Sequence, residues 1–174
     1  MQDIPKPELS EAFRAAFRCH PAGVAVITAT CDGKPYALTV SSLISVSAAP
    51  PVVAFSLSAQ SSAAKPVLEA ETVVIHMLRY GDLPLAQLGA TKGADRFDGS
   101  IPWETLPTGE PRYSSVQTWF RAKPVGQIPL NGAVLVAAEL LEGDAPDLEK
   151  VESESLIYMD RRWHRLREEI ESNL

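Results

Sequence analysis

Residues 21–60 read PAGVAVITATCDGKPYALTVSSLISVSAAPPVVAFSLSAQ and contain the densest strand pattern of the chain. Two runs rich in β-branched residues, Val24–Thr30 and Lys34–Val40, flank Cys31-Asp32-Gly33. An Asp-Gly pair between two apolar runs is typical of a tight hairpin turn. The stretch therefore predicts an antiparallel β-hairpin over residues 24–40.

Hydroxyl side chains gather where the strands of this stretch end. The second run closes with Thr39-Val40-Ser41-Ser42, where a core strand would ordinarily continue with apolar residues. A short strand follows over Leu43–Ser47, and Pro50-Pro51 must end it because proline has no N–H for a ladder. The next run, Val52–Ser58, again closes with small hydroxyl residues. Such strand ends indicate either ordinary turns or the lining of a polar ligand site.

The rest of the chain predicts short elements of both kinds. Helices are expected over Leu9–Phe17, from Ser61 or Ser62 as N-cap to about Ala70, and over Leu83–Leu88 with Asp82 as cap and Gly89 as stop. Strands are expected over 72–78, 116–122, 133–141 and 156–159, with an irregular segment over 91–113 and an acidic connection over 143–154. Residues 161–165 are expected to lead into a polar helical tail that ends at Leu174. No crossover helices separate the early strands. This order favours an antiparallel barrel over a parallel α/β sheet.

Composition limits the classes of function. The chain has 174 residues, which suits one domain over 1–174, and a net charge of −6 without a basic cluster, which argues against nucleic-acid binding. Its apolar runs are of strand length, so no membrane span is expected. The first residues lack the features of a signal peptide, and Cys19 and Cys31 have neither metal-ligand nor redox spacing. A cytoplasmic protein with free thiols is therefore expected.

The ordered motifs of residues 21–60 resemble the signature region of the flavin reductase-like family, the FMN-binding split barrels. The matching positions are Gly23-Val24, Thr28, Gly33, Thr39, Ser41-Ser42, Ser45-Val46-Ser47, Pro50-Pro51 and Phe55-Ser56-Leu57. Weaker matches follow at Phe97, Trp103, Gly109-Glu110-Pro111, Leu156-Ile157-Tyr158 and Trp163, so the resemblance covers roughly residues 10–166. It implies a mainly β fold, an antiparallel split β-barrel with a few short helices. It also implies a homodimer with flavin near the interface, and an opening helix that packs on the barrel.

Side chains alone give little support for unaided catalysis. The sequence has no glycine-rich dinucleotide fingerprint, no Walker loop and no metal-ligand spacing. Its three histidines, His20, His76 and His164, are scattered, and His76 lies inside an apolar strand pattern, where a hydrogen-bonded core histidine is the simpler interpretation. A bound cofactor would supply the chemistry that these residues lack.

The resemblance implies that FMN or FAD is this cofactor. It assigns the ring and the ribityl chain of the flavin to Thr39, Val40, Ser41 and Ser42. The phosphate is assigned to the region of Ser56, Ser58, Ser61 and Ser62, with Lys65 as a nearby charge. Arg96 and Phe97 would form a basic-aromatic pair near the flavin, and Arg161 and Trp163 would close the pocket. Two simpler interpretations stay open. Ser61-Ser62 can be only a helix cap, and Arg96-Phe97 can be a solvated arginine beside a buried ring.

One departure from the family concerns the nicotinamide. Many members carry a Gly-Asp-His triplet near the penultimate long strand, and this chain has Val125–Gly132 there without histidine. Three functions are weighed. The first is a flavin reductase that uses NAD(P)H as co-substrate and supplies reduced flavin to an oxygenase. The second is a flavin carrier or sensor without turnover, and the third is a barrel that binds an unrelated apolar ligand.

Overall fold

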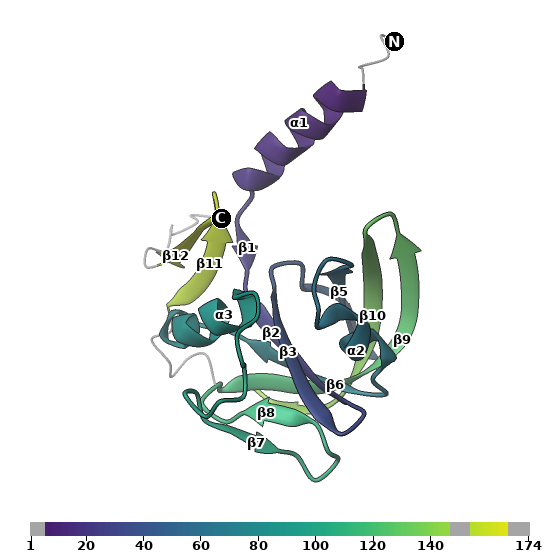
Figure 1. The fold of residues 1–174 in the computed structure, drawn as a ribbon, viewed down its shortest axis with the longest axis vertical. Helices are drawn as coiled ribbons and strands as arrows, with labels where there is room; N and C mark the ends of the chain where they lie inside the picture. Colours follow the sequence, from purple (N-terminus) through teal and green to yellow (C-terminus); the bar gives the residue numbers. More distant parts are fainter. Residues whose placement is uncertain (1–5, 147–153, 167–174) are drawn as a thin grey trace.

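The computed structural model describes residues 6–146 and 154–166, and antiparallel strands make up most of it (Figure 1). Its helical elements are α1 (Lys6–Arg18), α2 (Ala64–Glu69), the 3-10 turn η1 (Tyr80–Asp82) and α3 (Leu83–Ala90). Its strands are β1 (Ala22–Gly23), β2 (Ala25–Cys31), β3 (Lys34–Val40), β4 (Ile44–Ala48), β5 (Pro51–Ser58), β6 (Val73–Met77), β7 (Trp103–Thr105), β8 (Pro111–Tyr113), β9 (Thr118–Leu130), β10 (Ala133–Asp144), β11 (Ser155–Met159) and β12 (Arg162–Leu166).

The main sheet has seven strands in the order β3-β2-β6-β9-β10-β5-β4, so β3 and β4 are its two edges. Only residues 41–43 separate these two edge strands in the sequence. Such a segment spans at most about 14 Å from Val40 to Ile44, so the edges must lie close together and the sheet must curl. The result is a barrel that is split between β3 and β4. The predicted split-barrel class is thus confirmed, and two small sheets, β1-β11-β12 and β7-β8, accompany it.

The core has two parts, and β2 belongs to both because its successive side chains point to opposite faces. Ala25, Ile27 and Ala29 join the cluster that includes Phe55 of β5, whereas Val26 joins a second cluster with α3. All these side chains are buried. Burial on both faces explains why this run is almost continuously apolar.

The predicted hairpin is the one that connects β2 to β3. Cys31 pairs with Lys34, and the two turn residues, Asp32 and Gly33, have φ angles of 49° and 70°. These left-handed values are those of the tight turn that an Asp-Gly pair favours. The hairpin delivers Thr39 and Ser41 to the edge of the split.

Strand β9 is longer than the sequence pattern predicted, because it continues through Pro124 and Pro129 to Leu130. Its pairing with β6 ends at Ala122, and beyond that residue β10 is its paired neighbour among the described strands. Prolines are tolerated there because one side of the strand has no ladder to complete. The prediction that 125–132 only leads into the next strand was wrong, as was the expected end of β10 at residue 141.

The predicted N-cap of the second helix was wrong, and that of the third helix was correct in position but not in its bonding. Helix α2 begins only at Ala64, so Ser61 and Ser62 precede its N-cap residue, Ala63, which makes no side-chain cap bond. Pro66 still lies in the first turn, as expected. Asp82 is the N-cap residue of α3, as predicted, but its side chain accepts a hydrogen bond from the Arg79 backbone and makes no cap bond. Gly89 does not stop α3 but lies inside it.

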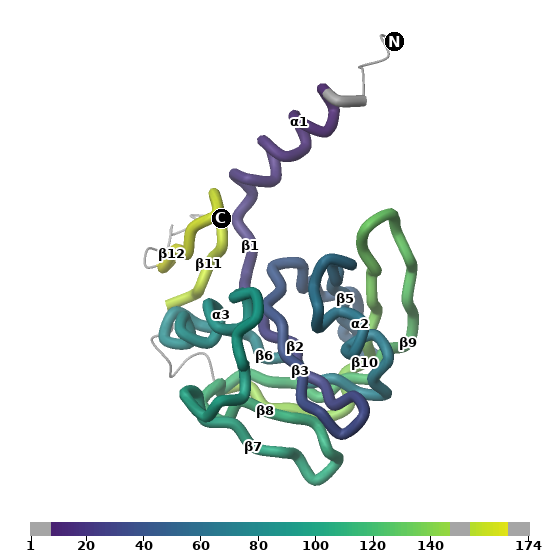
Figure 2. Tube along the Cα trace, viewed as in Figure 1, coloured from purple at the N-terminus to yellow at the C-terminus, as the bar shows by residue number. Residues whose placement is uncertain are grey.

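Helix α1 does not pack on the barrel, contrary to the expectation from the resemblance. It points away from the body of the molecule (Figures 1 and 2). Its apolar side chains Leu9, Phe13 and Phe17 are 58–60% exposed. Neither the barrel nor any other described element of this chain covers this apolar face.

The end of the described chain also differs from the prediction. Residues 161–165, expected only to lead into a helical tail, instead turn at Asp160-Arg161 and continue as β12, which pairs with β11. The residues after 166, where the expected helical tail ends, and most of the expected acidic connection lie outside the described residues. Among the helices that the structure describes, none is long and apolar enough to cross a membrane.

Candidate functional site

Two cavities meet at the split of the barrel. Ser41, Ser42 and Ser56 line both of them. Ser41 and Ser42 belong to the short segment that joins the two edge strands, and Ser56 lies on β5, the neighbour of β4. The topology that opens the barrel therefore places hydroxyl groups in the opening.

The first cavity, here called the serine cavity, has a volume of about 630 Å³, and ten of the 16 described residues that line it have polar or charged side chains. Its walls come from β3, β5, the loop before α2, the end of α3 with the following loop, and the β9–β10 turn. Nine of the residues that the sequence singled out line it: Thr39, Val40, Ser41, Ser42, Ser56, Ser58, Ser61, Ser62 and Arg96. Segments far apart in the sequence thus bring most of the predicted site together.

The hydroxyl groups of this cavity differ in how they are engaged. Ser42 Oγ accepts a hydrogen bond from Ser56 N at 2.9 Å and donates to Ser56 O at 3.1 Å, which ties the split segment to β5. Thr39 Oγ1 donates to Ala86 O of α3 at 2.8 Å. Ser41 is exposed, and within the described residues its hydroxyl makes no hydrogen bond. Ser41 can therefore bind a ligand without giving up an internal bond.

The positive charges of the serine cavity come from Arg96 and Lys92. The sequence analysis missed Lys92, which lies in a segment without periodicity. It assigned a charge to Lys65, whose ammonium group lies 3.7 Å from Glu69 on α2 and which is absent from the lining. No aspartate or glutamate occurs among the described residues that line this cavity. Its charge therefore favours an anionic ligand.

Phe97 lies beside the serine cavity rather than in its wall. Its ring stacks on Tyr113, with centroids 5.6 Å apart, and meets Trp103 edge-on. It faces a smaller neighbouring hollow of about 210 Å³, which shares Ser62 and Arg96 with the serine cavity. The basic-aromatic pair is thus divided, with Arg96 at the cavity and Phe97 in the packing behind it.

The second cavity, the helix-side cavity, has a volume of about 770 Å³ and lies between α1 and the barrel. Arg161 lines it at the β11–β12 turn, where Asp160 and Arg161 have φ angles of 50° and 58°. Asp160 N donates to Arg18 O at 2.6 Å and ties this turn to the end of α1. Trp163 packs on Tyr158 instead, with ring centroids 4.7 Å apart, and lines neither cavity.

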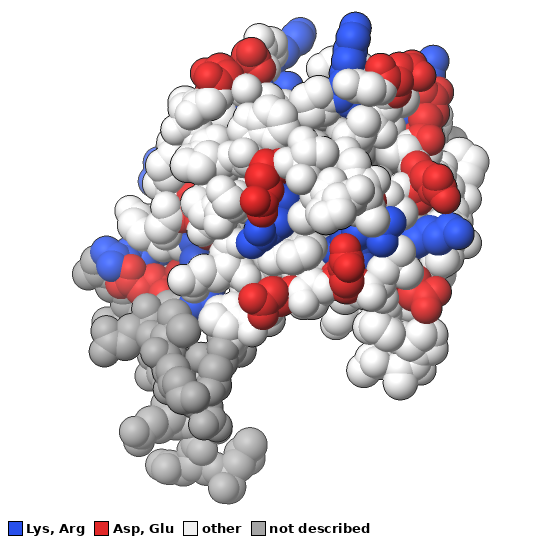
Figure 3. Space-filling model, turned by 90° about the horizontal axis from the view of Figure 1, so that it is seen from below, with Lys and Arg blue, Asp and Glu red and all other residues white. Residues whose placement is uncertain are grey.

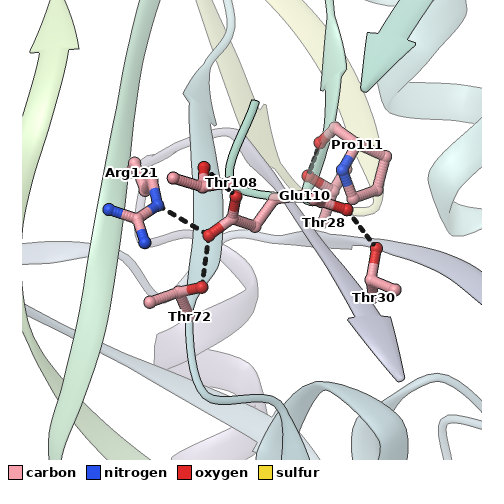
Figure 4. A network of polar contacts seen from close by, with 8 residues as sticks. Thr28, Thr30, Thr72, Thr108, Glu110, Pro111 and Arg121 are labelled. Atoms are coloured by element: carbon pink, nitrogen blue, oxygen red, sulfur yellow. Dashed lines mark hydrogen bonds and ion pairs between the residues drawn. The ribbon is translucent and has the colours of Figure 1, made fainter. Parts of the chain in front are cut away.

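A buried carboxylate outside the cavities holds the β7–β8 hairpin to the barrel (Figure 4). Glu110 is 3% exposed, accepts hydrogen bonds from Thr72 and Thr108, and pairs with Arg121 Nε at 2.6 Å. Burial acts to raise the pKa of Glu110, but these three hydrogen bonds outweigh it and hold the pKa below its ordinary value. The sequence marked Glu110 only as part of a weak match.

His76 is a buried, hydrogen-bonded core histidine, as its strand pattern indicated. Its Nδ1 lies 3.1 Å from Val26 O, and its Nε2 accepts from Tyr113 N at 3.0 Å. A carbonyl only accepts and an N–H only donates, so the ring is neutral with its proton on Nδ1. Burial lowers the pKa of His76 to about 4, against the hydrogen bond to Val26, and the charge of Arg112 lowers it further.

The residues of the serine cavity fit a phosphorylated flavin. The Ser41 hydroxyl, which has no partner among the described residues, the neighbouring serines and two cations are the donor set that a polyol chain and a phosphate need. The described residues hold no cluster of His, Cys, Asp or Glu that suits a metal ion. On the face in Figure 3, acidic and basic groups lie interspersed and form no continuous basic surface. A nucleic-acid interface therefore has no support on that face.

Comparison with known proteins agrees with this geometry. Residues 17–167 match the family model described as flavin reductase like domain. The chain is 34% identical over 172 residues to NADH:FMN oxidoreductase of Rhodococcus qingshengii, covering 94% of this chain and 90% of that protein. Over 96 residues it is 31% identical to the reductase component of a 4-nitrophenol and 4-nitrocatechol monooxygenase from Rhodococcus opacus, which is 55% of this chain and 52% of that protein.

The fold has close structural neighbours as well. The crystal structure of a flavin reductase domain protein from Arthrobacter sp. FB24 superposes with a TM-score of 0.85 and is 27% identical in sequence. The match covers 95% of this chain and 99% of that one. The same fold is therefore maintained over almost the whole chain.

Proposed function

The chain belongs to the flavin reductase-like family, and from this premise we propose that it reduces a flavin with a nicotinamide dinucleotide. The observation that carries the proposal is the serine cavity, which is open at the split and holds hydroxyl groups and cations without an acidic group among its described lining residues. A flavin supplies the hydride acceptor for such a reaction. FMN and NADH, the pair in the name of the Rhodococcus relative, are the first substrates to test.

The residues of the chain would bind and orient the reactants. We propose that Ser41 hydrogen-bonds the flavin, while Ser42 and Thr39 hold the split segment and α3 in place through their internal bonds. The phosphate end would bind beside Ser58, Ser61 and Ser62, on the side of the cavity that carries its two cations. Holding two reactants in contact contributes several kcal/mol to a hydride transfer, so no side chain has to act as an acid or base.

The helix-side cavity offers room for the dinucleotide. It adjoins the serine cavity at Ser41 and Ser42, and its described lining has three arginines, Arg14, Arg18 and Arg161, against one carboxylate, that of Asp160. These cations would favour the pyrophosphate of a dinucleotide. Arg161 is thus proposed to serve the co-substrate side of the site, with Trp163 supporting its hairpin from behind.

We propose that the whole chain is one domain that functions as a homodimer. The exposed apolar face of α1 needs a cover, and Ile44 and Val46 of β4 are also more than half exposed. A second copy of the chain would bury these surfaces next to the helix-side cavity and would complete its wall. Reduced flavin would then leave for a separate oxygenase, as the reductase role of the Rhodococcus opacus relative indicates. The free thiols of Cys19 and Cys31 suit a cytoplasmic protein.

Anaerobic mixing of the purified protein with FMN and NADH tests the function. Reduction of FMN, followed by the loss of its visible absorption, should be faster with protein than with free flavin and NADH alone. The same experiment with NADPH and with FAD ranks the substrates. A rate equal to the free-flavin background with all four pairs would contradict the proposal.

A flavin carrier without turnover is the second candidate, because the family's histidine is absent. Gln127, one residue after Gly126 in this region, donates its Nε2–H to Leu68 O at 2.9 Å and is held at α2. A carrier would bind FMN stoichiometrically and would leave it oxidised in the presence of NADH. The anaerobic experiment therefore separates the two functions.

A further inference from the structure

Lys92 lies at the wall of the serine cavity on the loop that follows α3. Resting on the proposed function, we infer that Lys92 is the cation that binds the terminal phosphate of the flavin and so distinguishes FMN from riboflavin. Arg96 would then be a positioning residue for the Lys92 loop. The argument depends on what the other charges near this cavity already do.

Arg96 is already bound to the backbone of its own loop. Its Nε donates to Gly89 O at 3.2 Å, its Nη2 to Thr91 O at 3.0 Å, and its Nη1 to Ala94 O at 3.4 Å. The loop therefore folds around the guanidinium group, with Lys92 between two of the carbonyls that it holds. Loss of Arg96 would release the loop and the lysine together.

The end of α3 favours a second cation beside Arg96. The last carbonyls of a helix carry partial negative charge, which repels an anion. Gly89 is in the last turn of α3, and its carbonyl is one of the acceptors of Arg96. These carbonyls offset part of the field of Arg96 and occupy its N–H donors. A phosphate in the serine cavity would therefore gain from a further positive group, and Lys92 is the other cation among the described lining residues.

Lys92 is free to serve this purpose. It is exposed, and within the described part of the chain it makes no ion pair or hydrogen bond. Lys65, the competing candidate from the sequence, is paired with Glu69 and is absent from the described cavity lining. Helix α2 has only six residues, so its N-terminus provides no alternative anion site.

The test compares FMN with riboflavin, which has the same ring and ribityl chain but no phosphate. Both are titrated into the wild-type protein and the variants, with flavin fluorescence as the signal. We expect Lys92→Met to raise the Kd for FMN about tenfold and to leave the Kd for riboflavin unchanged, because one charged contact to the phosphate is lost. The difference should shrink as salt is added, since the ammonium group is exposed.

Two variants serve as comparisons. Lys34→Met, at the start of β3 and outside the cavity lining, should change neither Kd. Lys65→Met should also change neither Kd if Lys92 is the phosphate ligand. Arg96→Met should weaken FMN more than Lys92→Met does, because it releases the loop that carries Lys92.

Each remaining outcome overturns the inference. An unchanged FMN affinity in Lys92→Met removes the contact, and an equal loss for FMN and riboflavin shows that Lys92 acts on the shape of the cavity. A loss of FMN with Lys65→Met, but not with Lys92→Met, moves the phosphate to α2. Wild-type protein that binds neither flavin contradicts the proposed function itself, and the inference fails with it.

Discussion

Gly89 of α3 lies directly against Thr39 of β3, so that a β-carbon on Gly89 would overlap the Thr39 hydroxyl and lie 3.3 Å from its backbone nitrogen. This approach also allows Thr39 Oγ1 to donate to Ala86 O. Gly89→Ala should therefore push α3 off β3 and lower the free energy of unfolding by about 1–3 kcal/mol, the usual cost of overpacking. Urea unfolding of the wild-type protein and of Gly89→Ala measures this difference in unfolding free energy.

A double-mutant cycle isolates the contact. Thr39→Ala removes the hydroxyl that an alanine at position 89 would meet. Gly89→Ala should therefore cost less in the Thr39→Ala background, by about 1 kcal/mol. Additive effects would show that the glycine is needed for another reason.

The Gly89–Thr39 contact is an example of a feature that could not be predicted from the sequence. A glycine near the end of a helical pattern usually ends the helix, and the sequence predicted that role for Gly89. Its actual role depends on Thr39, which lies 50 residues earlier on β3, and no local pattern displays that contact. The β2–β3 hairpin, in contrast, was predicted correctly because the Asp32-Gly33 turn and the two apolar runs are local features.

The candidate site likewise contains residues that the sequence could predict and residues that it could not. The ordered serines were predictable because they lie on consecutive elements of one motif. Lys65 was chosen for its closeness to Ser61-Ser62 in sequence, but α2 turns it towards Glu69, whereas Lys92 lies in an irregular segment. The direction of α1 was unpredictable for another reason, since an apolar helix face does not say which surface covers it.

Glu110 should contribute to stability above pH 4.5. Glu110→Gln removes the charge opposite Arg121, whose side chain is 18% exposed, and should cost about 2–4 kcal/mol of unfolding free energy at neutral pH. The pKa of Glu110 is lower in the folded protein than its ordinary value of 4.5, so its contribution is lost as pH falls from that value through the folded pKa. Unfolding curves of both proteins at several pH values should converge on the acidic side.

His76 should produce a separate pH effect between about 6.5 and 4. The unfolded chain takes up a proton near pH 6.5, whereas burial holds the pKa of the folded His76 at about 4. The free energy of unfolding should therefore fall by about 1.4 kcal/mol per pH unit as pH drops through this range, about 3 kcal/mol in all. His76→Gln is expected to be less stable at pH 7 but to lack this slope. A parallel slope in the variant would assign the effect to another group.

Ser41 and Ser42 form a matched pair of variants. Ser41→Ala removes a hydroxyl without a described partner, so the unfolding free energy should change by less than about 0.5 kcal/mol while FMN binds about 2–10-fold more weakly. Ser42→Ala removes both hydrogen bonds to Ser56 and should destabilise the protein by about 1–2 kcal/mol. Thermal unfolding and FMN titration of each variant separate the two roles. Unchanged FMN affinity in Ser41→Ala would place the ligand elsewhere.

The last prediction concerns the oligomeric state of the protein and rests on the exposed apolar face of α1. An isolated helix of 13 residues is only marginally stable in water. This helix carries the exposed side chains of Phe13 and Phe17, whose ring centroids lie 4.5 Å apart. A second copy of the chain that covers these rings would stabilise both helices. Phe13→Ser with Phe17→Ser should therefore convert a dimer to a monomer, as measured by light scattering, and keep the circular dichroism of the barrel. Glu11→Ser on the same helix should leave the dimer intact. A wild-type protein that is monomeric at micromolar concentration would contradict the homodimer, and a double variant that stays dimeric would move the interface to another surface.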